Sequence, residues 1–215
     1  MIPLNRPVPH RLPPFIVGIS GGSAAGKTMV ADILADMLAE YKPVVIGVDR
    51  YFFGSGHLSA ADLQEYNYDV PSAIDFNRLA RDVTAIKLGK PADLPIYDYV
   101  THSTMDEVDH VEPSSIIITE GILLFHSHEM KPLLDYTIFI DARRDERLRR
   151  RIGRDMAWRG RTKDDVIRQF NDTVEPAFEK YTAPTRSQAD IILDWNIKDF
   201  KALQKIADRI KELAT

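Results

Sequence analysis

Short apolar runs alternate with longer amphipathic stretches over most of the chain. The apolar runs have the length and composition of buried parallel strands, and they cover residues 15–19, 44–48, 115–119, 136–140 and 189–193. The stretches between them carry apolar residues at helical spacing, at 28–41, 75–88, 143–158, 163–181 (bent at Pro176) and 199–213. Strands that alternate with helices predict an α/β protein with a parallel sheet covered by helices on both faces.

The predicted strands are followed by residues that can bind or react. Gly21 closely follows the first strand, and Asp49, Glu120 and Asp141 directly follow three others. In open α/β sheets, ligands bind beyond the carboxyl ends of the strands. We therefore expect the functional site at that edge of the sheet.

Two segments depart from this alternation. Residues 1–14 contain five prolines, which predicts an extended arm ahead of a single domain over 15–215. Roughly seventy residues separate Asp49 from Glu120, which is more than a minimal strand–helix–strand unit needs. The region of about 50–112 therefore represents an insertion that could form a pocket for a second substrate.

The composition is that of a globular protein without disulfides. Of the 215 residues, 44% are hydrophobic and 28% are charged, and the formal net charge is −4. Nucleic-acid binders usually show a basic excess, so we expect no nucleic-acid partner. The absence of cysteine excludes thiolate catalysis and Cys-based zinc sites. No apolar run is long enough to span a bilayer and no signal-peptide core is present, so we expect a cytoplasmic protein without a membrane partner.

The segment between the first strand and the first helix has the pattern G-x-x-x-x-G-K-T of a phosphate-binding loop. Its glycines let backbone N–H groups surround phosphate oxygens, and the dipole of the following helix favours negative charge. The lysine supplies charge to the outer phosphates, and the next hydroxyl is placed to ligate Mg²⁺. The strand–loop–helix context favours this interpretation over a glycine-rich turn without a ligand. We therefore expect a P-loop NTPase-type sheet that binds ATP and Mg²⁺ through Gly21, Gly22, Ser23, Ala24, Ala25, Gly26, Lys27 and Thr28.

Two carboxylates fit the remaining needs of phosphoryl transfer. Asp49 follows the strand after the phosphate-loop helix, where it could accept a proton from an acceptor hydroxyl. Glu120 ends the next buried strand and could hold Mg²⁺ together with Thr28. The alternative is that each carboxylate only caps a strand end or a helix. The nearby phosphate loop favours the catalytic interpretation.

A strongly basic segment stands inside this acidic chain. Nine arginines lie between Arg143 and Arg161, and Arg151 and Arg154 belong to one helical stripe. Guanidinium groups clamp phosphates and neutralise the charge of a transition state, so the segment of about 143–180 is interpreted as an Arg-rich lid. A solvated basic face and a nucleic-acid patch remain alternatives.

The insertion is rich in aromatic and polar side chains. Aromatic walls with a few hydrogen-bonding groups suit a flat base attached to a sugar. An ordinary satellite core is the alternative. The side chains concerned are Tyr51, Phe52, Phe53, Tyr66, Tyr68, Asp69, Tyr97, Tyr99 and His102.

The ordered motifs resemble the uridine kinase family of the phosphoribulokinase/uridine kinase P-loop group. The resemblance extends from about residue 15 to residue 193. It rests on residues 21–28, 49–52, 68–76, 95–102, 119–123, 150–155 and 159–161 taken together. Such a series is more specific than any single motif.

The resemblance implies a kinase that phosphorylates the 5′-hydroxyl of uridine or cytidine with ATP or GTP, and that assembles as a homo-tetramer. Asp49 would be the catalytic base, assisted by Lys27, and Glu120 would belong to the magnesium site. The resemblance places Arg154, Arg159 and Arg161 in the catalytic lid. It places Asp69, Tyr97, Tyr99, His102, Arg151 and Gln169 around the nucleoside.

The sequence departs from the family pattern at two positions. Arg50 stands where the family usually has a small serine, and Thr104 stands where it usually has an arginine. Strand alternation also separates His102 from Tyr97 and Tyr99, so a turn or bulge near Val100 would be needed to unite them.

Because of these departures, a kinase that acts on a different acceptor remains an alternative. A phosphoribulokinase-like or pantothenate kinase-like enzyme would share the ATP half and change the acceptor half. A P-loop switch or transport ATPase is a different class. We found none of the Asp-x-x-Gly, Asn-Lys-x-Asp or Leu-Ser-Gly-Gly elements on which those proteins depend.

Overall fold

The computed structural model describes residues 13–55, 66–99 and 101–214. Most of the predicted proline-rich arm, and part of the predicted insertion, therefore lie outside the described residues. Within the described ranges, no helix is both long enough and apolar enough to cross a membrane.

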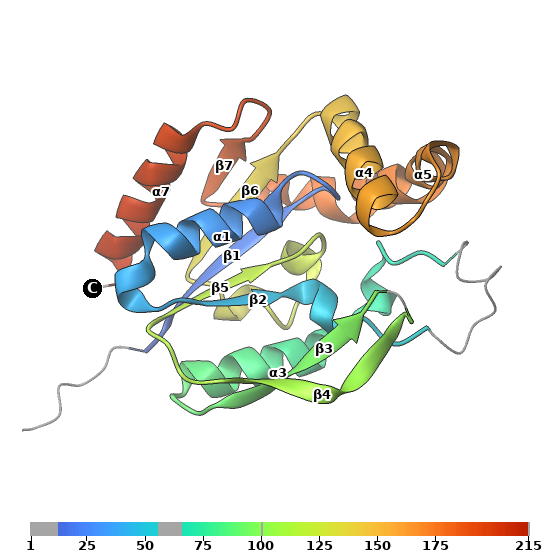
Figure 1. Ribbon diagram of the computed structural model, residues 1–215. Coiled ribbons are helices and arrows are strands. Elements are labelled where there is room, and N and C mark those ends of the chain that lie inside the picture. Colours follow the sequence, from blue (N-terminus) through green and yellow to red (C-terminus); the bar gives the residue numbers. More distant parts are fainter. Residues whose placement is uncertain (1–12, 56–65, 100, 215) are drawn as a thin grey trace, which may run out of the picture.

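Five parallel strands form the central sheet (Figure 1). They are β1 (Phe15–Gly21), β2 (Val44–Gly47), β5 (Ile116–Glu120), β6 (Tyr136–Asp141) and β7 (Ile191–Asp194), in the spatial order β2-β5-β1-β6-β7. The register places Glu120 opposite Ile19 of β1 and Gly47 of β2. The carboxyl end of β5 therefore lies between the phosphate-loop strand and the strand that precedes Asp49.

Helices cover both faces of this sheet, and each face has its own apolar core. Helices α1 (Lys27–Met37) and α7 (Phe200–Leu213) cover one face, and α3 (Phe76–Lys87) covers the other. Adjacent residues of β1 point to opposite sides, since Val17 packs with Leu34 while Ile16 packs with Leu79. The predicted α/β class with a doubly covered parallel sheet is confirmed.

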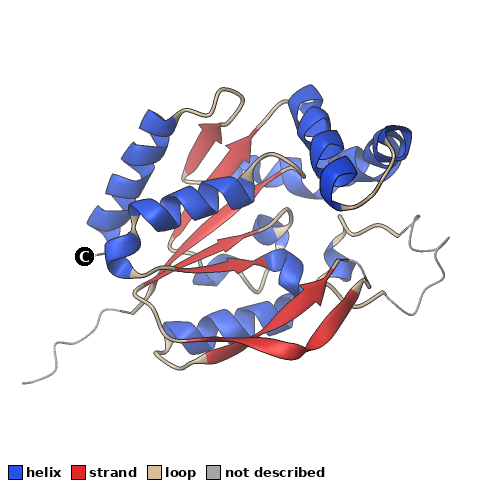
Figure 2. Cartoon of the chain, viewed as in Figure 1, coloured by secondary structure: helices blue, strands red, loops and turns tan. Residues whose placement is uncertain are grey.

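The insertion contains a hairpin that the sequence patterns did not predict. Strands β3 (Ala92–Asp98) and β4 (Ser103–Val111) pair antiparallel as a separate two-stranded sheet (Figure 2). Most of β4 is exposed, and its residues are mainly polar. It therefore lacks the apolar run or regular alternation by which a strand is recognised.

The predicted lid begins with α4 (Arg144–Trp158), which lies beside the start of α1 (Figure 1). The single bent helix predicted over 163–181 is instead a series of short helical segments. It consists of α5 (Lys163–Gln169), a π-helical segment (Phe170–Val174), α6 (Glu175–Ala177), a second π-helical segment (Phe178–Thr182) and a 3₁₀ segment (Ala183–Gln188). Proline disrupts regular helical hydrogen bonding, and Pro176 lies between the two π-helical segments.

The first helix is shorter than predicted. It ends at Met37 rather than Tyr41, and a 3₁₀ turn covers Ala39–Tyr41. Lys42 then adopts a left-handed conformation with φ of 49°. The residue before a proline avoids the right-handed helical conformation, and Pro43 follows Lys42.

Candidate active site

The phosphate loop curves from the end of β1 to the start of α1. Gly21 and Gly26 have φ angles of 149° and 107°, a region that favours glycine. The amide of Ala25 donates to the carbonyl of Gly22 at 3.0 Å, which closes a turn. Lys27 is buried, and its Nζ donates to the same carbonyl at 3.0 Å. The lysine therefore helps to hold the loop in its curved form.

Two buried side chains pack against this loop. A Cβ at Gly22 would lie 2.8 Å from Cδ of Arg147, and a Cβ at Gly26 would lie 2.7 Å from Cδ1 of Trp195. Arg147 and Trp195 expose at most 1% of their surfaces. Neither position therefore has room for a Cβ. At Gly26 the positive φ is a second reason for glycine.

Thr28 and Glu120, which are far apart in sequence, meet beside the loop. Oγ1 of Thr28 donates to Oε1 of Glu120 at 2.9 Å. Burial raises the pKa of Glu120, although the positive charge of Lys27 opposes that shift. Burial likewise lowers the pKa of Lys27, with the nearby Glu120, Asp49 and Asp69 carboxylates opposing it. One buried cation therefore lies among three carboxylates.

The hydroxyl of Thr28 and the carboxylate of Glu120 supply oxygen ligands of the kind that Mg²⁺ prefers. Within the described ranges, no group of three or more His, Asp and Glu side chains forms a protein cage for a metal. Mg²⁺ is usually held by one or two carboxylates together with waters and substrate phosphates.

Asp49 does not directly follow its strand as predicted but lies two residues beyond the end of β2, in a 3₁₀ turn. Strand β2 ends at Gly47, and the turn covers Val48–Tyr51. A Cβ at Gly121 would lie 2.4 Å from Cβ of Val48, so the end of β5 packs directly against the residue before Asp49. A cavity of about 360 Å³ is lined by Asp49 together with Lys27, Thr28, Glu120 and Arg154.

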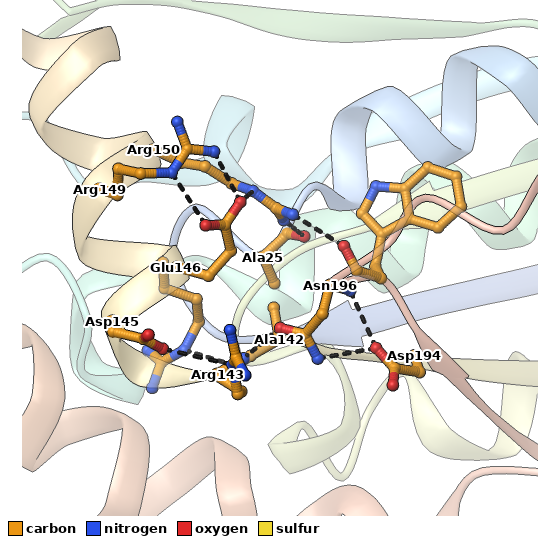
Figure 3. A network of polar contacts seen from close by, with 11 residues as sticks. Ala25, Ala142, Arg143, Asp145, Glu146, Arg149, Arg150, Asp194 and Asn196 are labelled. Carbon is orange, nitrogen blue, oxygen red and sulfur yellow. Dashed lines mark hydrogen bonds and ion pairs between the residues drawn. The ribbon is translucent and has the colours of Figure 1, made fainter.

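Arg150 of α4 joins the phosphate loop to the segment after β7 (Figure 3). Its Nη1 donates to the carbonyl of Ala25 at 2.8 Å, and its Nη2 donates to the carbonyl of Trp195 at 2.7 Å. Its Nε donates to Glu146, which also accepts from Arg149. A single guanidinium therefore links three segments that are distant in sequence.

Three of the lid arginines converge on one carboxylate. The Nε atoms of Arg151, Arg154 and Arg159 lie 3.3, 2.8 and 3.7 Å from the carboxylate oxygens of Asp155, which is fully buried. Burial opposes ionisation, but the guanidinium groups, Arg154 first, hold the pKa of Asp155 below its ordinary value. The backbone carbonyl of Asp155 also accepts hydrogen bonds from the amides of Arg159 and Arg161.

The end of the same helix carries an exposed aromatic side chain, because Trp158 exposes 85% of its surface.

Arg151 connects this cluster to the phosphate loop and to two residues expected near the nucleoside. Its Nη1 donates to Oγ of Ser23 at 2.7 Å, and its Nη2 donates to Oε1 of Gln169 at 2.9 Å. Gln169 also accepts a hydrogen bond from Arg161. Burial raises the pKa of Asp69, and the charge of Arg151 is the strongest opposing influence. Arg151 therefore lies near both Gln169 and Asp69.

Five of the side chains predicted to line the acceptor pocket form a connected series of rings. The rings of Tyr97 and Tyr99 lie 5.3 Å apart, and Phe52 contacts Tyr97 at 5.5 Å and Tyr68 at 5.4 Å. Tyr68 in turn stacks on His102 at 5.5 Å, and its hydroxyl lies 2.8 Å from Nδ1 of that histidine. Phe52 and Tyr68 thus connect His102 to the two tyrosines.

Strict strand alternation would place His102 on the opposite face from Tyr97 and Tyr99, but a turn after β3 interrupts the strand between them. Strand β3 ends at Asp98, and His102 adopts φ of 53° before β4 begins. The register also shifts between Pro95 and Tyr97. Tyr99 faces the lid and the carboxylates, since Arg159 lies 5.2 Å above its ring. Burial, followed by the charge of Asp49, raises the pKa of Tyr99.

Of the two departures from the family pattern, Arg50 lies against the hairpin and Thr104 lies within it. Arg50 forms a 3.0 Å ion pair with Asp109 and donates to the carbonyl of Pro95 at 3.4 Å. Thr104 is exposed and pairs with Tyr97 across the two strands. Arg50 is therefore held by the hairpin, and Thr104 supplies no cation beside Tyr97.

Comparison with known proteins identifies the family. The model of the phosphoribulokinase/uridine kinase family matches residues 16–197. This chain belongs to that family. A uridine kinase of Latilactobacillus sakei is 36% identical over 200 residues, which cover 93% of this chain and 94% of that protein. A uridine kinase of Streptococcus agalactiae serotype V is 33% identical over 203 residues, which cover 94% of this chain and 97% of that protein.

One similar plant protein is much longer than this family member. A chloroplastic uridine/cytidine kinase of Arabidopsis thaliana is 39% identical over 186 residues, which cover 86% of this chain but 38% of that protein. Two solved structures share the fold. They are a possible uridine kinase from Bacillus stearothermophilus (TM-score 0.61, 22% identity, 84% of this chain and 89% of that one) and a phosphoribulokinase from Rhodobacter spheroides (TM-score 0.61, 18% identity, 85% and 70%).

Three residues that organise the site of this kinase were not predicted from its sequence. Asp155, Arg150 and Trp195 each contact the lid arginines or the phosphate loop. Asp155 carries a signal that the sequence shows, because it lies four residues after Arg151 on the predicted helix and four residues before Arg159, which directly follows that helix. The contacts of Arg150 and Trp195 with the phosphate loop span more than 100 residues of sequence and have no local signal.

Proposed function

We propose that this protein transfers the γ-phosphoryl group of ATP to the 5′-hydroxyl of uridine or cytidine. The observation that carries the proposal is the single cavity lined by the phosphate-loop residues Lys27 and Thr28 and the carboxylates Asp49 and Glu120. The uridine kinases that match nearly the whole chain support a pyrimidine nucleoside as the acceptor.

The donor half of the proposed reaction uses the phosphate loop. Residues 21–28 would surround the phosphates of ATP, or of GTP, and Lys27 would neutralise charge on the outer phosphates. Thr28 and Glu120 would hold Mg²⁺, which supplies further neutralisation of the phosphates when bound. Arg154, Arg159 and Arg161 would surround the moving phosphoryl group from the lid.

The acceptor half begins at Asp49. In the proposed role, Asp49 orients the 5′-hydroxyl and accepts its proton as the phosphoryl group moves. Asp69 would accept hydrogen bonds from the ribose hydroxyls, and Arg151 and Gln169 would border the sugar. Tyr97, Tyr99 and His102 would contact the base. The proximity of Tyr99 to Asp49, and the separation of His102 from Tyr97 by Phe52 and Tyr68, favour a nucleoside that extends from the carboxylates towards the histidine.

One observation favours an alternative, in which the kinase phosphorylates a different acceptor. Thr104 leaves the wall beside Tyr97 without the cation that the family pattern usually has there. An enzyme that acts on another small hydroxyl compound, of the phosphoribulokinase or pantothenate kinase kind, would retain the donor half unchanged.

The deciding experiment measures ADP formation from ATP and Mg²⁺ with a panel of acceptors: uridine, cytidine, adenosine, ribulose 5-phosphate and pantothenate. We expect stimulation by uridine or cytidine, with the nucleoside monophosphate as product. Stimulation by one of the other acceptors, with silence from both pyrimidine nucleosides, would replace the proposed acceptor. Light scattering in the same buffer tests the proposed homo-tetramer.

A further inference from the structure

The carboxylate of Asp155 forms ion pairs with three arginines, and among them Arg154 donates a hydrogen bond to it through Nε. In each pair the nitrogen nearest to the carboxylate is Nε, at 3.3 Å for Arg151, 2.8 Å for Arg154 and 3.7 Å for Arg159. A guanidinium held through Nε can still present terminal nitrogens to another group. Arg154 is held in this way, whereas the Nε of Arg151 forms only the ion pair, and its Nη1 and Nη2 donate to Ser23 and Gln169.

The three guanidinium groups reach different parts of the proposed site. Arg151 contacts the phosphate loop, Arg154 lines the donor cavity, and Arg159 lies over the ring of Tyr99 on the acceptor side. The carboxylate between them is fully buried, whereas the side chains of Arg154 and Arg159 expose 40% and 37% of their surfaces. The buried carboxylate is thus the anchor, and the partly exposed side chains of Arg154 and Arg159 are available to a ligand.

Charge explains why the cluster needs such an anchor. Three neighbouring cations repel one another, and long side chains lose rotamer freedom when they are fixed. One carboxylate screens this repulsion and leaves an excess of two positive charges beside the cavity. Groups that are already oriented need little reorganisation when negative charge develops in a transition state.

We propose that Asp155 is the positioning residue of the lid, which holds Arg151, Arg154 and Arg159 as one preorganised array around the moving phosphoryl group. Asp155 acts through these arginines and does not itself contact the substrates. The inference rests on the proposed phosphotransferase function, but it does not depend on which acceptor is used.

The test compares Asp155→Asn with Asp145→Asn. Asp145 lies on the same helix and pairs with Arg143 at 3.5 Å, but its side chain is 75% exposed. We expect Asp155→Asn to lower kcat by on the order of tenfold to a hundredfold, with a much smaller change in the Kd of a non-hydrolysable ATP analogue. Asp145→Asn should retain the wild-type kcat. A wild-type kcat in Asp155→Asn would overturn the proposal.

A double-mutant cycle distinguishes positioning from a general structural role. If Asp155 acts partly through Arg154, Asp155→Asn should cost a smaller factor in kcat on an Arg154→Met background than on the wild type. Equal factors on both backgrounds would reject the inference. If Asp155→Asn does not fold, Asp155→Glu takes its place in the cycle. It keeps the charge but displaces the carboxylate, so it should fold and show a lowered kcat, and a wild-type kcat would again reject the inference.

Two activity assays distinguish a failure of the positioning role from a failure of the proposed acceptor. Each variant is assayed with uridine and also by the slow hydrolysis of ATP without an acceptor. Absence of uridine stimulation in the wild type would reject the proposed acceptor. The effect of Asp155→Asn on acceptor-free hydrolysis would still support or overturn the positioning role.

Discussion

The hydroxyl of Thr28 donates a 2.9 Å hydrogen bond to the carboxylate of Glu120, and this contact joins the start of α1 to the end of β5. Burial raises the pKa of that carboxyl group above its ordinary value of 4.5 in the folded protein. A raised pKa means that the folded state favours the protonated acid. The corresponding stability is present below pH 4.5 and is lost as the pH rises through the folded-state pKa.

Glu120→Gln should therefore stabilise the protein at neutral and alkaline pH in the absence of Mg²⁺ and nucleotide. The amide oxygen can still accept the hydrogen bond from Thr28, but no charge has to be buried. Urea unfolding at pH 4 and pH 8 measures the difference. The variant should exceed the wild type in unfolding free energy at pH 8, and the gap should narrow towards pH 4. A gap that is independent of pH would contradict the assigned cause.

Asp49→Asn should lower turnover by on the order of a hundredfold or more, because an amide cannot accept the proton of the acceptor hydroxyl. The Kd of a non-hydrolysable ATP analogue should change little. Lys27→Ala is the contrasting variant, since it should weaken binding of the analogue as well as turnover. Equal losses of nucleotide affinity in both variants would argue against Asp49 as the base.

Gly26→Ala should destabilise the protein by about 2–4 kcal/mol through backbone strain and overpacking. The glycine has φ of 107°, and an added Cβ would lie 2.7 Å from the indole of Trp195. Gly153→Ala is a matched control, because a Cβ there meets nothing within 4 Å and lies inside α4. Thermal unfolding should show a lower Tm for the first variant and an equal or higher Tm for the second. Similar Tm changes in both would refute the packing argument.

Tyr68→Phe should raise the KM for the nucleoside on the order of tenfold while leaving the KM for ATP unchanged. The substitution removes the hydroxyl that lies 2.8 Å from Nδ1 of His102, and so frees the imidazole to reorient. Tyr66→Phe serves as the control, because it removes the hydroxyl of a neighbouring tyrosine whose ring lies 4.6 Å from that of Tyr68. Parallel changes in both KM values would indicate a global disturbance instead of an effect on the acceptor side.

The central sheet was predictable because its strands are buried on both faces and therefore form continuous apolar runs. The phosphate loop was equally readable, since its backbone geometry demands glycine at fixed spacing. The hairpin of β3 and β4 was not readable. The exposed strand β4 contains residues such as Asp106 and Glu107 that show no burial pattern, and its pairing with β3 is a tertiary effect.

The candidate site was predictable where a motif carries it, as for Lys27 and Thr28. Contacts made through long side chains were not. The link from Arg150 to Ala25 joins residues 125 positions apart, and a surface arginine in a basic helix has the same local sequence appearance. Asp49 was expected directly at the end of a strand, and the intervening turn at Val48 was not foreseen because it depends on packing against Gly121.

The two tryptophans of this chain occupy opposite environments. Trp195 is fully buried against Gly26, whereas Trp158 lies at the end of α4 with 85% of its surface exposed. Their fluorescence should therefore separate, with iodide quenching Trp158 and sparing Trp195. A Trp158→Phe variant retains a signal from beside the phosphate loop, and a Trp195→Phe variant retains one from the lid. The protein thus carries two intrinsic optical probes, one for each of the elements expected to enclose the nucleotide.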